Sequence, residues 1–330
     1  MTRTAAYRAA GVTLTVLVTA AVALDAASFA ISGRVYGFGL FVGVPFFIGF
    51  FSVAVYAFYG PRPLWKCLLL AAVTGVVLAL GFLLLGREGL LCIAATVPLG
   101  LPIVLIGALS AYLVVHRSGR LAPLPAAGVV LVLLFAGIVA EPHAGLTAPV
   151  YVVEDSLDVA ASAERVWDTI INLGELPPPS DWLLRSGVAC PRRVEMLGAG
   201  VGSRRICTLS TGPMDELVTA WDPGRRLGWD VTFTPPPLRE LNPISQPDPP
   251  HLHGFYRSLR GEFELVGSGD RTRVWRRTWY QHNLYPAAYW RLWCDLIARR
   301  AHQYVLQEVK AIAEQPAAAE RVASSHQPPS

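Results

Sequence analysis

The stretch YVVEDSLDVAASAERVWDTI, residues 151–170, predicts a strand followed at once by a helix. Its first nine positions alternate, as in a strand with one buried face, and the apolar positions are Tyr151, Val153, Leu157 and Val159. Ser162 can cap a helix that carries Glu164 in its first turn and stops near Gly174. This part of the chain therefore predicts the start of an α+β domain.

Antiparallel strands are predicted to follow this opening. Strand periodicity returns at residues 192–198, 202–211, 215–221, 225–233, 259–267 and 271–283. The turns WDPGRR and Ser268-Gly269-Asp270 favour hairpins between neighbouring strands. A short helix is expected at Asp181–Ser186. Residues 234–254 contain seven prolines and predict a long loop that could gate a binding site.

The chain then reaches YPAAYWRLWCDLIARRAH, residues 285–302, which opens an amphipathic helix of roughly 28 residues. Helical spacing is followed by the apolar positions 289, 293, 296, 297, 301, 304, 305, 309 and 312. A membrane-surface helix or an ordinary core helix is the alternative. The element order favours one antiparallel sheet around this last helix, with a hollow between them.

Three motifs carry a family resemblance. YVVEDSLDVAASAERVWDTI resembles the opening of the START-like, Bet v 1-like superfamily (SRPBCC), which includes polyketide cyclase/dehydrase and lipid-transport domains. WDPGRRLGWDV is similar to a hairpin of that group, and TRVWRRTWY to its last strand. The resemblance implies a helix-grip domain at residues 149–315, with an apolar cavity under the C-terminal helix. Fusion to a membrane domain departs from the commonest members.

Residues 1–148 are expected to form a multi-pass transmembrane domain. A helix needs about 20 apolar residues to cross a bilayer, and five runs reach or approach that length: 11–32, 36–59, 64–85, 89–115 and 121–140. All backbone polar groups must be paired within lipid, so we expect these runs to be helices. The tail, residues 316–330, has the composition of a disordered segment.

The loop cations predict the orientation of these spans. One set of loops holds Arg3, Arg8, Arg62, Lys66, Arg117 and Arg120, and the other holds only Arg34 and Arg87. This places the N-terminus in the cytoplasm and, with five spans, the C-terminal domain outside the cell membrane. Pro98 and Pro102 leave open that residues 89–115 form two half-spans. An even number of spans would put the domain in the cytoplasm.

Strand parity and helical spacing predict the side chains that face the hollow. We expect Glu264 opposite Arg273, which turns Arg276 inward, where a buried cation needs a partner. Arg276 is either an anion-binding group or part of a structural ion pair. The residues expected to line the cavity are Trp229, Val231, Phe233, Val274, Arg276, Thr278, Tyr280, Tyr289, Trp293, Leu296 and Ile297.

No motif predicts a metal, a cofactor or a catalytic group. His251 and His253 form an H-x-H pair, but no third ligand stands at a typical spacing. His282 and His302 could act as bases, with His302 expected on the polar side of the last helix, but no nucleophile–base–orienter set is visible. The second part of the chain is near neutral in charge, so no nucleic-acid partner is expected. Protein partners are not predicted.

Three functional hypotheses follow from the sequence. The first is a membrane-anchored domain that binds a hydrophobic small molecule, such as a lipid, beside the lipid bilayer. The second is a membrane-tethered cyclase, dehydratase or hydrolase that uses the same cavity. The third is a protein-interaction module whose hollow is filled by its own tryptophans, since eight of the nine follow residue 150.

Overall fold

The computed structural model describes residues 3–58, 60–119 and 122–315, and they form two compact units. The helical unit contains the chain up to Ala148 together with Glu240–Phe255 and His282–Trp293. The helix-grip unit contains Pro149–Arg239, Tyr256–Gln281 and the chain from Cys294 onward. The tail predicted to be disordered, residues 316–330, lies outside the described residues.

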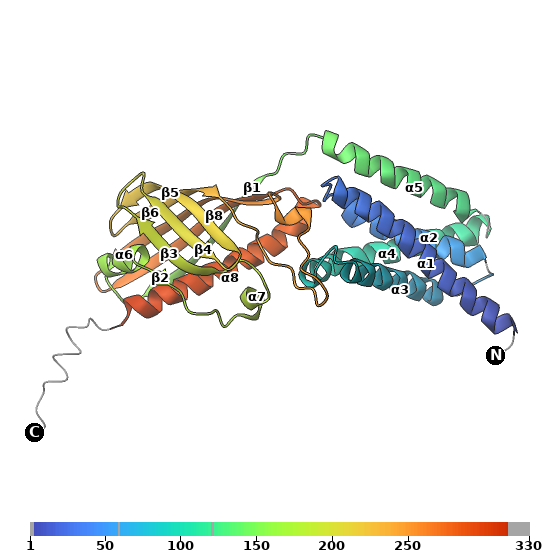
Figure 1. Cartoon of the computed structure of the whole chain (residues 1–330), viewed down its shortest axis with the longest axis horizontal. Coiled ribbons are helices and arrows are strands. Elements are labelled where there is room, and N and C mark those ends of the chain that lie inside the picture. The colour runs from blue at the N-terminus through green and yellow to red at the C-terminus, as the bar shows by residue number, and fades with distance from the viewer. Residues whose placement is uncertain (1–2, 59, 120–121, 316–330) are drawn as a thin grey trace, which may run out of the picture. The chain divides into compact units, whose positions relative to one another are not determined.

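Five long helices build the helical unit (Figure 1). They are α1 (Arg3–Ser32), α2 (Val44–Phe58), α3 (Leu64–Leu84), α4 (Leu90–Ser118) and α5 (Pro123–Ala140), with short turns η1 (Gly39–Gly43) before α2 and η2 (Glu141–His143) after α5. Within the described residues, and by length and composition alone, five helical segments are apolar enough to cross a membrane. Helix α4 continues through Pro98 and Pro102, so the alternative of two half-spans is wrong.

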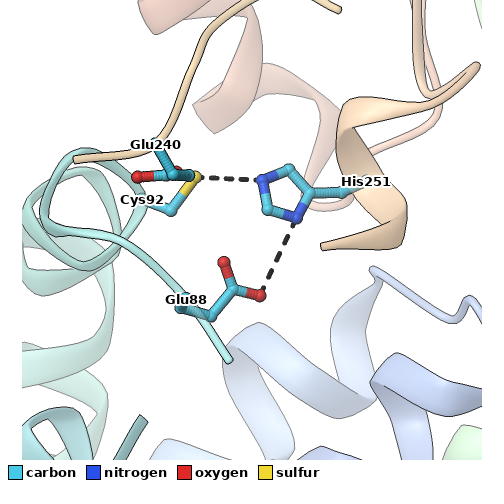
Figure 2. Close-up of side chains that lie close together, drawn as sticks. All are labelled: Glu88, Cys92, Glu240 and His251. Carbon is cyan, nitrogen blue, oxygen red and sulfur yellow. Dashed lines mark hydrogen bonds and ion pairs between the residues drawn. The ribbon is translucent and has the colours of Figure 1, made fainter. Parts of the chain in front are cut away.

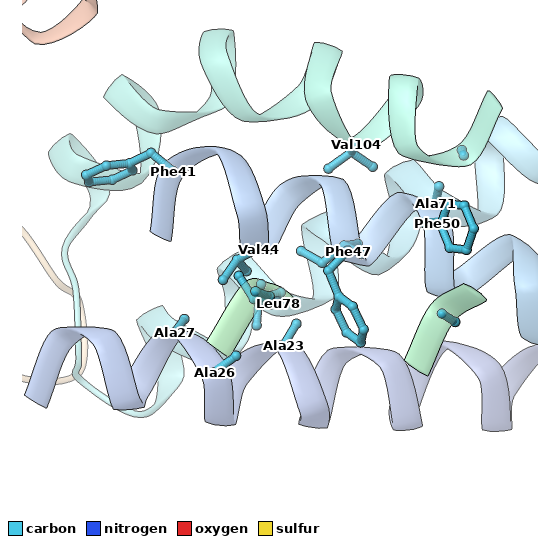
Figure 3. Close-up of a cluster of buried hydrophobic side chains, with 14 of the residues drawn as sticks. Ala23, Ala26, Ala27, Phe41, Val44, Phe47, Phe50, Ala71, Leu78 and Val104 are labelled. Atoms are coloured by element: carbon cyan, nitrogen blue, oxygen red, sulfur yellow. The ribbon is translucent and has the colours of Figure 1, made fainter. Parts of the chain in front are cut away.

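Helices α2 and α4 pack with their backbones in close approach. A Cβ atom on Gly49 would lie 1.8 Å from the carbonyl oxygen of Val104, and one on Gly107 would lie 2.2 Å from that of Phe46. On another side of the bundle, Figure 3 shows Val44 and Phe47 of α2 facing the small side chains of α1, such as Ala23. Small residues therefore set the distances between these helices.

A single eight-stranded sheet forms most of the helix-grip unit. Neighbouring strands from β2 to β7 pair antiparallel, and so do β1 and β8. The strands are β1 (Val150–Val159), β2 (Gly174–Glu175), β3 (Pro191–Leu197), β4 (Arg204–Leu209), β5 (Gly212–Asp222), β6 (Arg226–Phe233), β7 (Tyr256–Ser268) and β8 (Arg271–His282). Their order in the sheet is β1-β8-β7-β6-β5-β4-β3-β2. The short strand β2 was not predicted from the sequence.

Two short helices follow β1 as the sequence predicts. Helix α6 (Ala163–Ile171) begins after Ser162, whose hydroxyl accepts a hydrogen bond from the Arg165 amide at 3.4 Å. Helix α7 (Trp182–Arg185) begins after Asp181, which caps the amides of Leu183 and Leu184. Both caps satisfy amides that a helix start leaves unpaired.

The last helix, α8 (Ala287–Ala313), runs along the curled sheet in its second part (Figure 1). Its buried side chains there include His302, Val305, Leu306 and Val309. They meet a core formed by the sheet and α6, with Val166, Trp229 and Phe263 among its members. The predicted helix-grip fold, an antiparallel sheet around a long C-terminal helix, is confirmed.

Candidate functional site

The inner face of the sheet carries a row of charged side chains rather than a purely apolar lining. Arg205 of β4 stands opposite Glu216 of β5 in the strand register, and Val231 of β6 stands opposite Glu216 on the other side. Met196 of β3 is the partner of Arg205. Because side chains of paired residues point to the same face of a sheet, these four side chains lie side by side on one face.

The Arg205–Glu216 pair is almost fully removed from water. The two residues are 3% and 2% exposed, and a guanidinium nitrogen of Arg205 donates to the Glu216 carboxylate. The Arg205 guanidinium also lies 4.1 Å from the ring centre of Trp229, which is itself 1% exposed. Burial raises the pKa of Glu216, and the two nearby arginines oppose that shift. A buried charge of this kind persists only with its partner.

Arg276 adds a second cation to the same interior. Its guanidinium stacks on Trp229 at 4.6 Å and on Phe263 at 4.7 Å from the ring centres. The buried atoms Nε and Nη1 find no hydrogen-bond acceptor within the described residues, although the residue as a whole remains partly exposed. Burial, reinforced by Arg205, lowers the pKa of Arg276 to about 10, so it is still a cation at neutral pH. The cluster around Trp229 therefore holds two arginines and one glutamate.

A second polar set links the sheet to α8. The Thr278 hydroxyl lies 2.8 Å from Nε2 of His302, and Nδ1 of the same ring lies 2.9 Å from a carboxylate oxygen of Asp155. Arg299 also contacts Asp155 at 3.3 Å. His302 is 4% exposed, so its expected place on the polar side of the helix is wrong. Burial lowers the pKa of His302, which keeps the ring neutral and able to accept a proton.

These contacts form the hydroxyl–imidazole–carboxylate arrangement that the sequence did not reveal. The members come from β8, α8 and β1, far apart along the chain. Strand parity placed Thr278 on the inner face, and it could also have placed Asp155 there, because Asp155 is the register partner of Arg276. To place His302 beside them, the prediction also needed the face of α8 that meets the sheet. The sequence analysis chose the wrong face, because it put His302 on the polar side of the helix.

The strand residues proposed for the cavity mostly lie on the inner face. Val274 and Tyr280 are 0% exposed, Thr278 is 8% exposed, and Val231 packs against the core. The Tyr280 hydroxyl donates to Asp295 of α8 at 2.6 Å. Phe233 is the exception, since it lies at the end of β6 with 54% of its surface exposed.

The residues of the last helix that were expected to face the cavity do not form the surface that meets the sheet. Tyr289 and Trp293 belong to the helical unit and pack against its core, where the Tyr289 hydroxyl donates to the carbonyl of Ala95. Leu296 is 38% exposed and Ile297 is partly exposed. The α8 residues that face the sheet are instead His302, Val305, Leu306 and Val309.

On the outer face of the sheet, one predicted cross-strand ion pair, Glu264 with Arg273, differs from the structure. Glu264 contacts Arg277 rather than Arg273, and Arg277 also contacts Glu154 and Glu262. Arg273 lies 3.9 Å from Asp158 instead. These contacts leave the inward direction of Val274, Thr278 and Tyr280 unchanged, because the parity of β8 is as predicted.

The helical unit contains polar features that the sequence did not predict. An open pocket of about 450 Å³ is lined by residues that include Arg34, Tyr36, Glu141 and His253. The second half of the proline-rich loop belongs to this unit. It brings Glu240 and His251 beside Glu88 and Cys92, a set of potential metal ligands that no spacing in the sequence revealed.

Comparisons with known proteins concern the fold. No family model matches the chain, and no curated protein matches it. Among solved structures, a truncated norcoclaurine synthase from Thalictrum flavum is 14% identical, with 52% of this chain covering 98% of that one and a TM-score of 0.35. The Zhui aromatase/cyclase from Streptomyces sp. R1128 is 17% identical, with coverages of 54% and 99% and a TM-score of 0.36. Such distant similarity assigns neither an activity nor a ligand.

Proposed function

We propose that the helix-grip unit binds a hydrophobic small molecule that carries an anionic group, such as an acidic lipid, and that the helical unit anchors it in a bilayer. One observation carries this proposal: Arg276 is a cation inside the domain whose buried Nε and Nη1 donors find no acceptor among the described residues. A carboxylate or phosphate oxygen would supply the missing acceptors, and arginine suits both groups geometrically.

Apolar surface for the rest of the ligand lies on the same face of the sheet. Met196, Met214 and Val231 pack against the core yet stay partly exposed. Methionine side chains adapt easily to different apolar shapes. Burial of such surface contributes roughly 25 cal/mol per Å² before the costs of association. Trp229 and Phe263 fill the middle of the domain, so the ligand would lie beside these rings.

The outer surface of the five helices supports membrane anchoring. Large apolar side chains are exposed there, including Leu17 at 58%, Leu69 at 55% and Val132 at 67%. Contact with lipid would remove this surface from water. The loop cations support a cytoplasmic N-terminus, with the helix-grip unit on the outer side. A site tethered near the bilayer would meet lipophilic ligands at a high effective concentration.

The binding proposal is tested with a fluorescent fatty acid and the full-length protein in detergent micelles. Wild type should bind the probe saturably, and Arg276→Met should weaken binding about tenfold or more, as expected when a charge-assisted hydrogen bond is lost. Arg273→Met is the matched control, since Arg273 lies on the same strand with its side chain 53% exposed. Equal binding by wild type and Arg276→Met would contradict the proposal. Absence of binding in wild type would favour the interaction module.

A hydrolase is the second candidate, favoured by the contacts among Thr278, His302 and Asp155. His302 could take the Thr278 proton as the hydroxyl oxygen attacks the ester carbonyl carbon, and return it to the alcohol that leaves when the ester C–O bond breaks. Water would then release the acyl group from Thr278, and Asp155 would orient the ring throughout. The test is hydrolysis of a panel of activated esters by wild type, Thr278→Val and His302→Gln. Activity that is lost in both variants would support the enzyme. Activity that persists in both would assign these contacts to the attachment of α8 to the sheet.

A further inference from the structure

A compact cluster of four potential metal ligands lies in the helical unit, separate from the helix-grip site. Glu88 precedes α4, Cys92 stands in its first turn, and Glu240 and His251 come from the proline-rich loop (Figure 2). One ligand atom from each residue lies within 4.8 Å of the others. Sγ of Cys92 is 3.0 Å from Nε2 of His251, and a Glu88 oxygen is 3.8 Å from Nδ1 of the same ring.

The loop is held in place by contacts other than the cluster itself. The Asn242 side chain donates to the carbonyls of Leu83 at 2.8 Å and Glu88 at 3.2 Å. The Leu90 amide donates to the Leu241 carbonyl at 2.8 Å. Gly89 leaves room for the Glu240 carboxylate, because a Cβ there would lie 2.0 Å from its Oε2. The four side chains are therefore brought together by backbone contacts around them.

Several buried polar atoms of the cluster have no hydrogen-bond partner among the described residues. Glu240 is 5% exposed and His251 is 9% exposed. Within the described residues, Oε2 of Glu88, Nδ1 of His251 and both carboxylate oxygens of Glu240 make no hydrogen bond. The amides of Leu91, Cys92 and Leu241 lie near the Glu240 carboxylate without forming a hydrogen bond to it. Buried polar atoms normally have a hydrogen-bond partner or a bound ion, so a ligand at this site would explain these atoms.

We propose that Glu88, Cys92, Glu240 and His251 bind a divalent transition metal ion, with zinc as the best match. Thiolate, imidazole and carboxylate are the ligand types of protein zinc sites, and four protein ligands make a closed structural site. Nε2 of His251 faces Cys92 and is therefore the nitrogen that would bind the metal. Figure 2 shows that one Glu88 oxygen points into the space between Cys92 and His251. The metal would fasten the proline-rich loop to the start of α4.

Distances and charge both suit this ion. Ligand atoms about 2.0–2.3 Å from a tetrahedral zinc lie about 3.3–3.8 Å apart, so side-chain shifts of about 1 Å convert the observed geometry. Two carboxylates, a thiolate and a neutral imidazole carry three negative charges, which a divalent cation reduces to one.

Equilibrium binding of metal to the full-length protein tests the proposal. The protein is purified in detergent, stripped with a chelator and titrated with Zn²⁺ against a competing chelator. We expect one ion per chain, with affinity reduced more than about 100-fold in Cys92→Ser and His251→Ala, beyond the 10–100-fold typical of residues that only support ligands. Matched controls are Cys67→Ser, a buried thiol in α3, and His253→Ala, a neighbouring imidazole. Both should bind zinc as wild type does.

Cobalt substitution gives a second readout that does not depend on any variant. Co²⁺ bound to wild type should show a sulfur-to-metal charge-transfer band and intense visible bands, as a tetrahedral site with one thiolate requires. Gly89→Ala, which removes no ligand but displaces Glu240, should weaken zinc binding by about 10–100-fold. No binding by wild type, cobalt spectra without the thiolate band, or full affinity in both Cys92→Ser and His251→Ala would overturn the proposal.

Discussion

The two units bury polar clusters of opposite charge. One cluster in the helix-grip unit holds Arg205 and Arg276 against Glu216, a surplus of one positive charge when Glu216 is ionised. The helical unit holds Glu88 and Glu240 beside Cys92 and a neutral His251, a surplus of potential negative charge. A buried surplus is costly in either case. The difference teaches that the first cluster suits an anion and the second a cation.

The largest expected effect tests the pairing inside the helix-grip unit. Arg205→Met would leave Glu216 buried without its hydrogen-bonded partner, which typically costs about 3–5 kcal/mol of folding free energy. Denaturant unfolding of the full-length protein, followed by tryptophan fluorescence, measures this loss. A variant as stable as wild type would show that Glu216 is neutral in the folded state, and the surplus positive charge would then be larger.

Removal of metal tests the other cluster. At a free zinc concentration of 100 times Kd, binding to the folded state alone stabilises a protein by about 2.7 kcal/mol. We therefore expect zinc to raise the thermal midpoint of the stripped protein, and the rise to be absent in Cys92→Ser. Proteolysis within residues 240–255 should also become faster after chelation. A thermal midpoint that does not respond to zinc would contradict the claim that the cluster in the helical unit binds a cation.

Arg276→Met gives a smaller effect on stability than Arg205→Met. Arg276 is not the hydrogen-bonded partner of Glu216, and its replacement by an apolar side chain of similar length removes a desolvated cation. Such replacements are often neutral or stabilising, so we expect a stability within about 1 kcal/mol of wild type or above it. The same unfolding assay measures it. A loss as large as that of Arg205→Met would show that Arg276 is a structural ion-pair member.

The smallest effect concerns acid stability. Burial lowers the folded pKa of His302 below its usual 6.5, so the unfolded chain takes up a proton first as pH falls. This contribution to stability is complete above about pH 6.5 and is lost as pH falls from there through the lowered folded pKa. His302→Gln should make stability less sensitive to acid between about pH 7 and pH 5. Identical pH profiles for the variant and wild type would contradict the burial of a neutral ring.

The strands were predictable because their periodicity is a local signal. Val274, Arg276, Thr278 and Tyr280 face inward as the alternation in β8 predicts, and Ser162 caps the helix it was expected to cap. The face of α8 was not predictable in the same way. Its first turns belong to the helical unit and the rest to the helix-grip unit. The sequence analysis assumed that one face of the helix carries all the apolar positions toward the sheet, and it therefore misplaced Tyr289 and Leu296.

The two polar clusters were largely hidden in the sequence because long-range folding assembles them. Cys92 and His251 are separated by 159 positions, and no metal-binding spacing joins them. Asp155 and His302 are separated by 147 positions. Arg276 was singled out because a cation on a predicted inner face is unusual. Its stacking on Trp229 and Phe263 depends on the curl of the sheet, which strand parity alone does not give.

Native mass spectrometry of the full-length protein, released from detergent micelles, tests the central claim most directly. We expect wild type and Arg273→Met to carry one acidic lipid or similar amphipathic anion per chain, and Arg276→Met to carry it on a much smaller fraction of chains. An anion retained by Arg276→Met to the same extent as by wild type, or a wild-type protein that carries no small molecule even after incubation with acidic lipids, would contradict the assignment of Arg276 as the anchor of a ligand.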